Sequence, residues 1–213
     1  NNDNEFFFPR SSIKIFQAIP FAMSNAIKNY RLSKKHIALA CASHKGEKIH
    51  IRELKKWISK IDLKTKNLKC GIHGPLDKKA YEKIIYSKKK FNELHNNCAG
   101  KHLAMLTSCL INNQNINNYL DYNHTHQKNI RKVFNKFTET KLSKKNFSLD
   151  GCSAPQYSFK IKSISKALNN LIKSYKDGYD YSEEVKTLIN SVLENPEFIG
   201  GTESFDTKVM KAS

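Results

Sequence analysis

Apolar residues recur at helical spacing along most of the chain. In the segment 50–61, Leu54, Trp57, Ile58 and Ile61 fall on one face of a helix. Similar patterns predict helices over 12–30, 76–91, 97–111, 124–138, 160–175 and 181–194. The stretch "NFSLDGCSAP" is typical of a short strand that ends in a turn at Gly151. The pattern therefore predicts a mostly helical protein with a few short strands.

The length and the cysteine content indicate one domain in a reducing compartment. The 213 residues contain no repeat, no Gly/Ser linker and no Pro-rich stretch, so we expect one folding unit over 1–213. The five cysteines are an odd number and do not form the paired pattern of a disulfide scaffold. They favour a reducing compartment, so we expect a cytoplasmic location. No apolar run approaches the ~18 residues of a membrane span, so we expect no membrane partner.

The formal charge of +18 raises the alternative of a basic nucleic-acid-binding module. Only four of the 37 basic residues are arginine, the residue whose planar fork suits phosphates and bases. The lysines are dispersed and accompany many Asn and Ile residues, which is typical of a compositional bias. Nucleic-acid binding is therefore the less favoured interpretation.

Ser11 and Lys14 have the spacing of a Ser-x-x-Lys pair, in which a neutral lysine accepts the hydroxyl proton and makes the serine a nucleophile. Roughly three such matches are expected by chance in a chain so rich in both residues, and Ser87/Lys90 and Ser163/Lys166 have the same spacing. From spacing alone, Ser11 or Ser12 is better explained as a helix N-cap.

The cysteines offer three short pairs that could each form part of a zinc site. These are Cys41/His44, Cys70/His73 and Cys98/Lys101. A buried cysteine is also a common core residue, so each pair alone is ambiguous. Cys152, in a turn beside Asp150, adds a possible distant ligand with a carboxylate that could orient it.

Six blocks, taken together in their order, are more specific than any of these pairs. They are "FFPRSSIKIFQAIP", "ALACASHKGEKIH", "CGIHGPLD", "LHNNCAGKHLAML", "DGCSAPQYSF" and "ESFDTKVM". Their order resembles the bacterial L-asparaginase II family, the rhizobial-type or class 3 asparaginases. The resemblance extends from about Phe6 to Met210.

The resemblance implies roles for individual residues. Ser11 would be a nucleophile paired with Lys14, and Ser43 of "CASH" a second serine beside them. Arg10 would bind the substrate carboxylate, with His44 also on the substrate side.

The resemblance also implies a zinc ion, with the positions of Cys98, Lys101 and Cys152 as ligands, a water in the fourth place and Asp150 nearby. A lysine can be a ligand only as the neutral amine, so the metal must hold its pKa far below that of free lysine.

The implied fold is α/β (α+β) and resembles the serine β-lactamase and glutaminase group, with a helical region packed on an antiparallel sheet. The implied reaction is hydrolysis of L-asparagine to L-aspartate and ammonia through a serine acyl-enzyme, and the implied assembly is a homodimer. A zinc-binding asparaginase remnant without activity is the alternative.

Two departures from the family pattern stand out. Ala99 replaces the serine of the family's "NNCSGKH". Family members also continue past "FDT" to a segment with a second catalytic lysine and have an earlier segment ahead of "FPRSS". From the resemblance we expect a domain incomplete at both ends, without the family's C-terminal part and with low turnover by itself.

Overall fold

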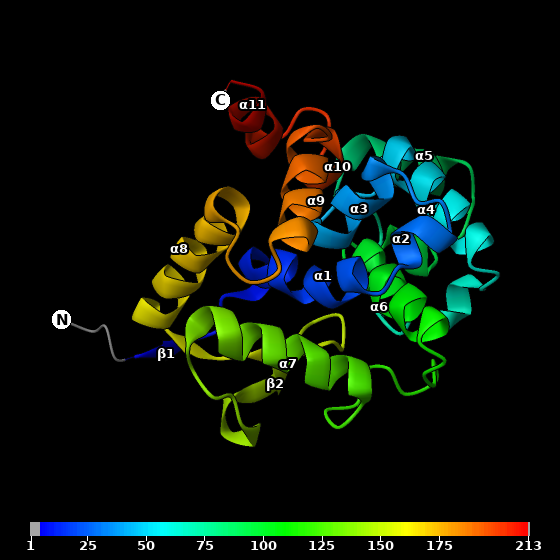
Figure 1. The fold of residues 1–213 in the computed structure, drawn as a ribbon. Helices are drawn as coiled ribbons and strands as arrows, with labels where there is room; N and C mark the ends of the chain where they lie inside the picture. Colours follow the sequence, from blue (N-terminus) through cyan, green and yellow to red (C-terminus); the bar gives the residue numbers. More distant parts are fainter. Residues whose placement is uncertain (1–4, 213) are drawn as a thin grey trace.

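The computed structural model describes residues 5–212 and shows a helical protein with little sheet (Figure 1). The α-helices are α1 (Lys14–Met23), α2 (Ala26–Asn29), α3 (Lys34–Cys41), α4 (Lys48–Lys60), α5 (Lys78–Tyr86), α6 (Ala99–Ile111), α7 (Thr125–Thr138), α8 (Ile161–Asp177), α9 (Ser182–Leu193), α10 (Glu197–Gly200) and α11 (Phe205–Ala212). Short 3-10 helices are η1 (Arg10–Ile13), η2 (Thr65–Asn67), η3 (Glu93–His95) and η4 (Lys144–Asn146).

The strands form two antiparallel pairs in the described part of the chain. β1 (Phe6–Phe7) pairs with β4 (Phe159–Lys160), and β2 (Phe147–Leu149) pairs with β3 (Pro155–Tyr157). The turn between β2 and β3 begins at Asp150, whose N–H donates to Ala154 O at 2.8 Å. The predicted combination of helices with a small antiparallel sheet is therefore confirmed at this coarse level.

The core lies where α1, α3, α6, α7 and α9 pack together. Every residue of α6 from Ala99 to Cys109 is buried, as its apolar sequence predicts. On α1, Phe16 packs edge-on against Phe137 of α7, and Phe21 packs against Trp57 of α4. The same helix α1 also packs directly against α3 and α6.

Gly100 allows the closest of these helix contacts. A Cβ at this position would overlap the carbonyl oxygen of Leu39 on α3. Only glycine therefore permits the first turn of α6 to touch the last turn of α3. The residues at these two helix ends, Cys98 and Ser43 among them, are brought to the same region as a result.

Five predicted helices, over 50–61, 97–111, 124–138, 160–175 and 181–194, are confirmed with small shifts in their ends. The helix predicted over 76–91 is shorter and ends at Tyr86. The single helix predicted over 12–30 is wrong: a 3-10 turn comes first, and Asn25, with φ of 56°, separates α1 from α2. One residue in the left-handed conformation ends a helix, and it does so without altering the spacing of apolar residues from which the helix was predicted.

Three helices are capped at their N-termini by a histidine at the third helical position. Nδ1 of His36, His50 and His95 accepts the N–H of Ser33, Glu47 and Asn92, each at 3.0 Å. The histidine replaces the Glu or Gln of a usual capping box. Burial lowers the pKa of each of the three rings below 6.5. The rings therefore stay neutral in the folded protein and keep Nδ1 as an acceptor.

No helix in the described part of the chain is long and apolar enough to cross a membrane.

These histidines predict a loss of stability in mild acid. Below pH 6.5 the unfolded chain takes up protons that the folded rings do not, so the free energy of unfolding should decrease as the pH falls from 7 to 5. His95→Gln keeps a capping acceptor and removes one titrating group. Urea unfolding across this range should show a shallower slope for this variant, by at most about 1.4 kcal/mol per pH unit. An unchanged slope would contradict the linkage.

Candidate active site and metal centre

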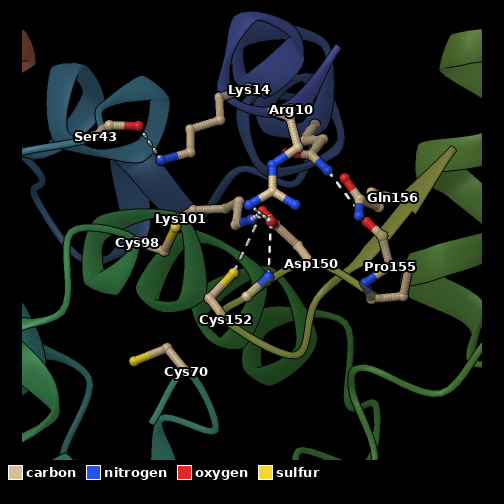
Figure 2. Close-up of polar contacts among 12 residues, drawn as sticks. Arg10, Lys14, Ser43, Cys70, Cys98, Lys101, Asp150, Cys152, Pro155 and Gln156 are labelled. Atoms are coloured by element: carbon tan, nitrogen blue, oxygen red, sulfur yellow. Dashed lines mark hydrogen bonds and ion pairs between the residues drawn. The ribbon is translucent and has the colours of Figure 1, made fainter. Parts of the chain in front are cut away.

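Lys14 is the first residue of α1, and only 1% of it is exposed. Its Nζ donates to the carbonyl oxygen of Ala42 at 2.6 Å and to Ser43 Oγ at 2.7 Å (Figure 2). Both acceptors follow α3 directly, because Ala42 takes extended backbone angles and ends that helix. The structure therefore joins Lys14 to a serine 29 positions away.

Ser11 lies in η1 with its side chain exposed. Its carbonyl oxygen accepts the backbone N–H of Lys14. No hydrogen bond joins the side chains of these two residues in residues 5–212, because the Lys14 amine is directed at Ser43. Ser11 thus lies three residues before Lys14 in the sequence, but its side chain does not contact the Lys14 amine. Its role as the nucleophile stays a prediction.

Burial lowers the pKa of Lys14 below its ordinary value of 10.5. The negative charge of Cys98 opposes this shift, and the positive charge of Lys101 adds to it. With a lowered pKa, Lys14 loses its proton more easily than free lysine does. In the neutral form its amine can accept a proton from a serine hydroxyl. The 2.7 Å contact with Ser43 has the length that such a transfer requires.

A second group of side chains meets at the N-terminal end of α6. Cys98 precedes the first residue of this helix, Lys101 lies in its first turn, and Cys152 comes from the turn between β2 and β3. The sulfur atoms of both cysteines and a carboxylate oxygen of Asp150 all lie within 4.8 Å of one another. Lys101 Nζ is 3.7 Å from Asp150 Oδ2.

The charges in this group are coupled. A hydrogen bond from Cys152 lowers the pKa of Cys98 to about 5, with Lys101 and Lys14 adding to the effect against burial. The same hydrogen bond, together with burial, raises the pKa of Cys152. Burial disfavours the Lys101 cation, but the charges of the two cysteines outweigh it and raise the pKa of Lys101. These shifts favour a thiolate at Cys98 beside the protonated amine of Lys101.

These residues fit a zinc ion by the chemistry of their donors. Zinc prefers thiolate and nitrogen ligands, and Cys98 already supplies a thiolate. Binding would displace the protons of Cys152 and Lys101, as is usual for ligands that titrate. Asp150 is close enough to interact with the bound group, because its Oδ2 lies 3.8 Å from Cys152 Sγ.

Arg10 links the two halves of the site. Its Nη2 lies 3.1 Å from Asp150 Oδ1, and its side chain is 60% exposed. Asp150 Oδ1 also accepts the N–H of Gly151 at 2.8 Å, which holds the carboxylate in the turn. The exposed guanidinium, predicted to bind the substrate carboxylate, therefore begins from an ion pair with a carboxylate of the protein itself.

His44 is fully buried, and its ring stacks on His50 with centroids 5.3 Å apart. Its Nδ1 accepts the N–H of Gly46 at 3.1 Å. Burial lowers its pKa well below 6.5, so the ring is neutral. In this position His44 supports the segment that follows Ser43, and its contact with substrate stays a prediction.

The two other cysteine pairs are not gathered into a comparable cluster. Burial raises the pKa of Cys41 and of Cys70 to about 12, so both are thiols. His73 Nε2 accepts the backbone N–H of Asn97 at 3.1 Å. Among the described residues, the group of His, Cys, Asp and Glu side chains close enough to hold a metal is the one at Cys98.

Sequence reasoning missed two polar groups of the site. The Ala42 carbonyl is a backbone acceptor, and no sequence pattern marks it. Gln17 is buried, and its Nε2 donates to Pro155 O at 3.4 Å, which ties α1 to the strand after Cys152. Gln17 lies three residues after Lys14, so the shared helix face was an available signal.

Comparison with known proteins assigns the family. A search of curated proteins finds no match. The family model described as L-asparaginase II matches residues 1–213, the whole chain. The six ordered sequence blocks, with Lys14, Ser43 and the cysteine cluster gathered in one region, agree with that match. The chain therefore belongs to the L-asparaginase II family.

Proposed function

We propose that this chain is an L-asparaginase-type amidohydrolase, which converts L-asparagine and water to L-aspartate and ammonia through a serine acyl-enzyme. Membership of the asparaginase family supports a hydrolase acting on a small-molecule substrate. The observation that carries the proposal is the buried Lys14 amine, 2.7 Å from Ser43 Oγ. A lysine beside a serine is a base positioned to receive a hydroxyl proton.

In the proposed reaction, Ser11 attacks the side-chain amide carbon of the substrate. The Lys14–Ser43 pair receives the Ser11 proton, which requires the exposed Ser11 side chain to turn towards that pair. The proton then passes to the leaving nitrogen, and ammonia departs. Water hydrolyses the acyl-enzyme by the same proton path in reverse. Arg10 binds the substrate carboxylate, and exchanges its ion pair with Asp150 for that contact.

Cys98, Lys101 and Cys152 would hold the zinc ion of this proposal. A bound zinc supplies a fixed positive charge that can stabilise developing negative charge. The proposal includes the fold expected from the family resemblance, a serine β-lactamase-like and glutaminase-like arrangement. The packing of the helices against antiparallel strands is compatible with it.

The identity of the nucleophile can be tested by trapping. We expect an asparagine analogue with an electrophilic side chain to label Ser11, because that residue forms the acyl-enzyme. Peptide mapping by mass spectrometry, with ammonia release from L-asparagine measured in parallel, gives the answer. Ser11→Ala should lose both label and activity, whereas Ser12→Ala, its exposed neighbour, should keep both. Label on Ser43, or ammonia release by Ser11→Ala, would contradict the assignment.

The pH dependence tests Lys14 as the base. Because burial lowers the pKa of Lys14, activity should rise with pH as the amine loses its proton, and it should do so below the 10.5 of free lysine. Lys14→Arg should be slower by roughly 10²–10⁴-fold, since guanidinium does not act as a base near neutral pH. If this variant kept most of the activity, Lys14 would act only through its positive charge and not as a base.

The metal site predicts about one zinc per chain in protein purified without chelators. Cys152→Ser should bind much less zinc, because it removes a predicted ligand. Cys109→Ser is the matched control, a buried cysteine on α6 outside the cluster. Elemental analysis of the three proteins decides the point. Equal zinc in Cys152→Ser and the unaltered chain would exclude this ligand set.

A further inference from the structure

A hollow of about 590 Å³ lies where the start of α3 meets α4 and the end of α9. Two carboxylates line it, those of Glu53 and Glu194. The lining also contains four cationic side chains, which are Lys34, Lys35, Arg52 and Lys56. None of these residues belongs to the predicted catalytic or metal-binding groups. The hollow is therefore a separate charged surface in which positive charge exceeds negative charge.

Glu53 holds two of the cations in place. This residue is only 4% exposed, and its Oε1 accepts from Arg52 Nε at 3.1 Å and from Lys56 Nζ at 2.9 Å. Its Oε2 lies 3.8 Å from Nε2 of the buried His36. Burial raises the pKa of Glu53, but the hydrogen bonds from Lys56 and Arg52 outweigh it and lower that pKa. A fixed, charged carboxylate thus orients both cations at the edge of the hollow.

Arg52 contacts Glu53 through Nε and not through its terminal fork. Within residues 5–212, no hydrogen bond joins its two Nη groups to another residue. The side chain is 55% exposed, so the fork is accessible from solvent. A guanidinium fork presents parallel N–H donors that match two oxygens of a carboxylate or a phosphate. The structure therefore leaves an oriented pair of donors free for an oxyanion.

The start of α3 favours an anion in the same hollow. The first N–H groups of a helix have no intrahelical acceptor, and the helix dipole attracts negative charge to this end. The first turn of α3 contains no acidic residue and begins instead with Lys34 and Lys35. Lys34 Nζ is paired with Glu194 at 2.6 Å, whereas Lys35 Nζ lies 5.6 Å from the centre of the Phe198 ring. A bound anion would complement both the helix end and these lysines.

We propose that this hollow binds the phosphate group of a small molecule. Two phosphate oxygens would lie on the Arg52 fork, and the remaining oxygens would face Lys56 and the start of α3. A phosphate suits this set better than a carboxylate, because it has more oxygens and more charge to share among several cations. The volume falls in the range of about 300–1,000 Å³ that is usual for small-molecule sites. The proposal does not depend on the proposed asparaginase activity.

Titration with inorganic phosphate is the first test, at constant ionic strength so that general screening does not change. In ¹⁵N-labelled protein, the backbone amide signals of Lys34 and Lys35 should shift and reach saturation. Arg52→Gln should weaken phosphate binding by roughly tenfold or more, because it removes a charged hydrogen-bonding group. Arg52→Lys keeps the charge without the fork, and its affinity should fall between the two.

Two further variants separate this site from general attraction by lysines. Lys55→Gln is the matched control, an exposed lysine on α4 that does not line the hollow, and it should bind phosphate like the unaltered chain. Glu194→Gln removes the carboxylate that occupies Lys34, so it should bind phosphate more tightly. Equal losses in Lys55→Gln and Arg52→Gln would overturn the proposal. Failure of the Lys34 and Lys35 signals to shift would overturn it too.

A second titration, with glycerol phosphate, distinguishes a phosphorylated small molecule from free phosphate. Tighter binding of the ester would support the proposed occupant, because contacts beyond the phosphate group would then contribute. Much tighter binding of inorganic phosphate would show that the hollow takes only the free ion and would overturn the assignment of the occupant. Sodium chloride that produced the same shifts as phosphate would overturn the site itself.

Discussion

The buried amine of Lys14 is the constraint on which the site depends. Removing an amine from water costs several kcal/mol unless polar groups replace the water. Here Ala42 and Ser43 supply the replacement from the end of α3, and the Cys98 thiolate supplies a negative charge from the start of α6. Both helix ends must therefore reach the same point. The contact of Gly100 with α3 makes that possible.

The two buried lysines of the site show how neighbouring anions decide a pKa. Lys14 and Lys101 are 1% and 3% exposed, so burial acts on both. Lys101 faces both cysteines and Asp150, and its pKa rises. For Lys14, burial outweighs the negative charge of Cys98, and the positive charge of Lys101 adds to the effect of burial, so its pKa falls. Two helices, α1 and α6, thus bring a potential base near Ser43 and a cation near the thiolate into one site.

The sequence predicted the elements well where the apolar pattern is strong, as in α6, and failed where one residue decides. Asn25 interrupts the first helix by a single left-handed conformation, and α3 was not predicted. The candidate residues came from motif order, since spacing alone did not distinguish the three Ser-x-x-Lys matches. Lys90 is exposed, whereas Lys14 is buried.

The spacing of residues within a short motif could not predict contacts between residues that lie far apart in the sequence. The contact of Lys14 with Ser43 joins positions far apart in sequence, and so does the meeting of Cys98 with Cys152. These meetings result from helix packing, which depends on side-chain shape at every contact rather than on a short motif. A shared face on α1, as for Gln17 and Lys14, is the kind of local information that sequence does contain.

The helix α5 is attached differently from all of these elements, because none of its residues is buried. A helix that buries so little opens at low cost in free energy, independently of the core. Its lysines, with those of the segment 88–90 that follows, are exposed. A trypsin cut in this segment would leave two fragments that the core still holds together. We therefore expect that two separately produced chains, divided at α5, reassemble through the contacts of α1 and α3 with α6.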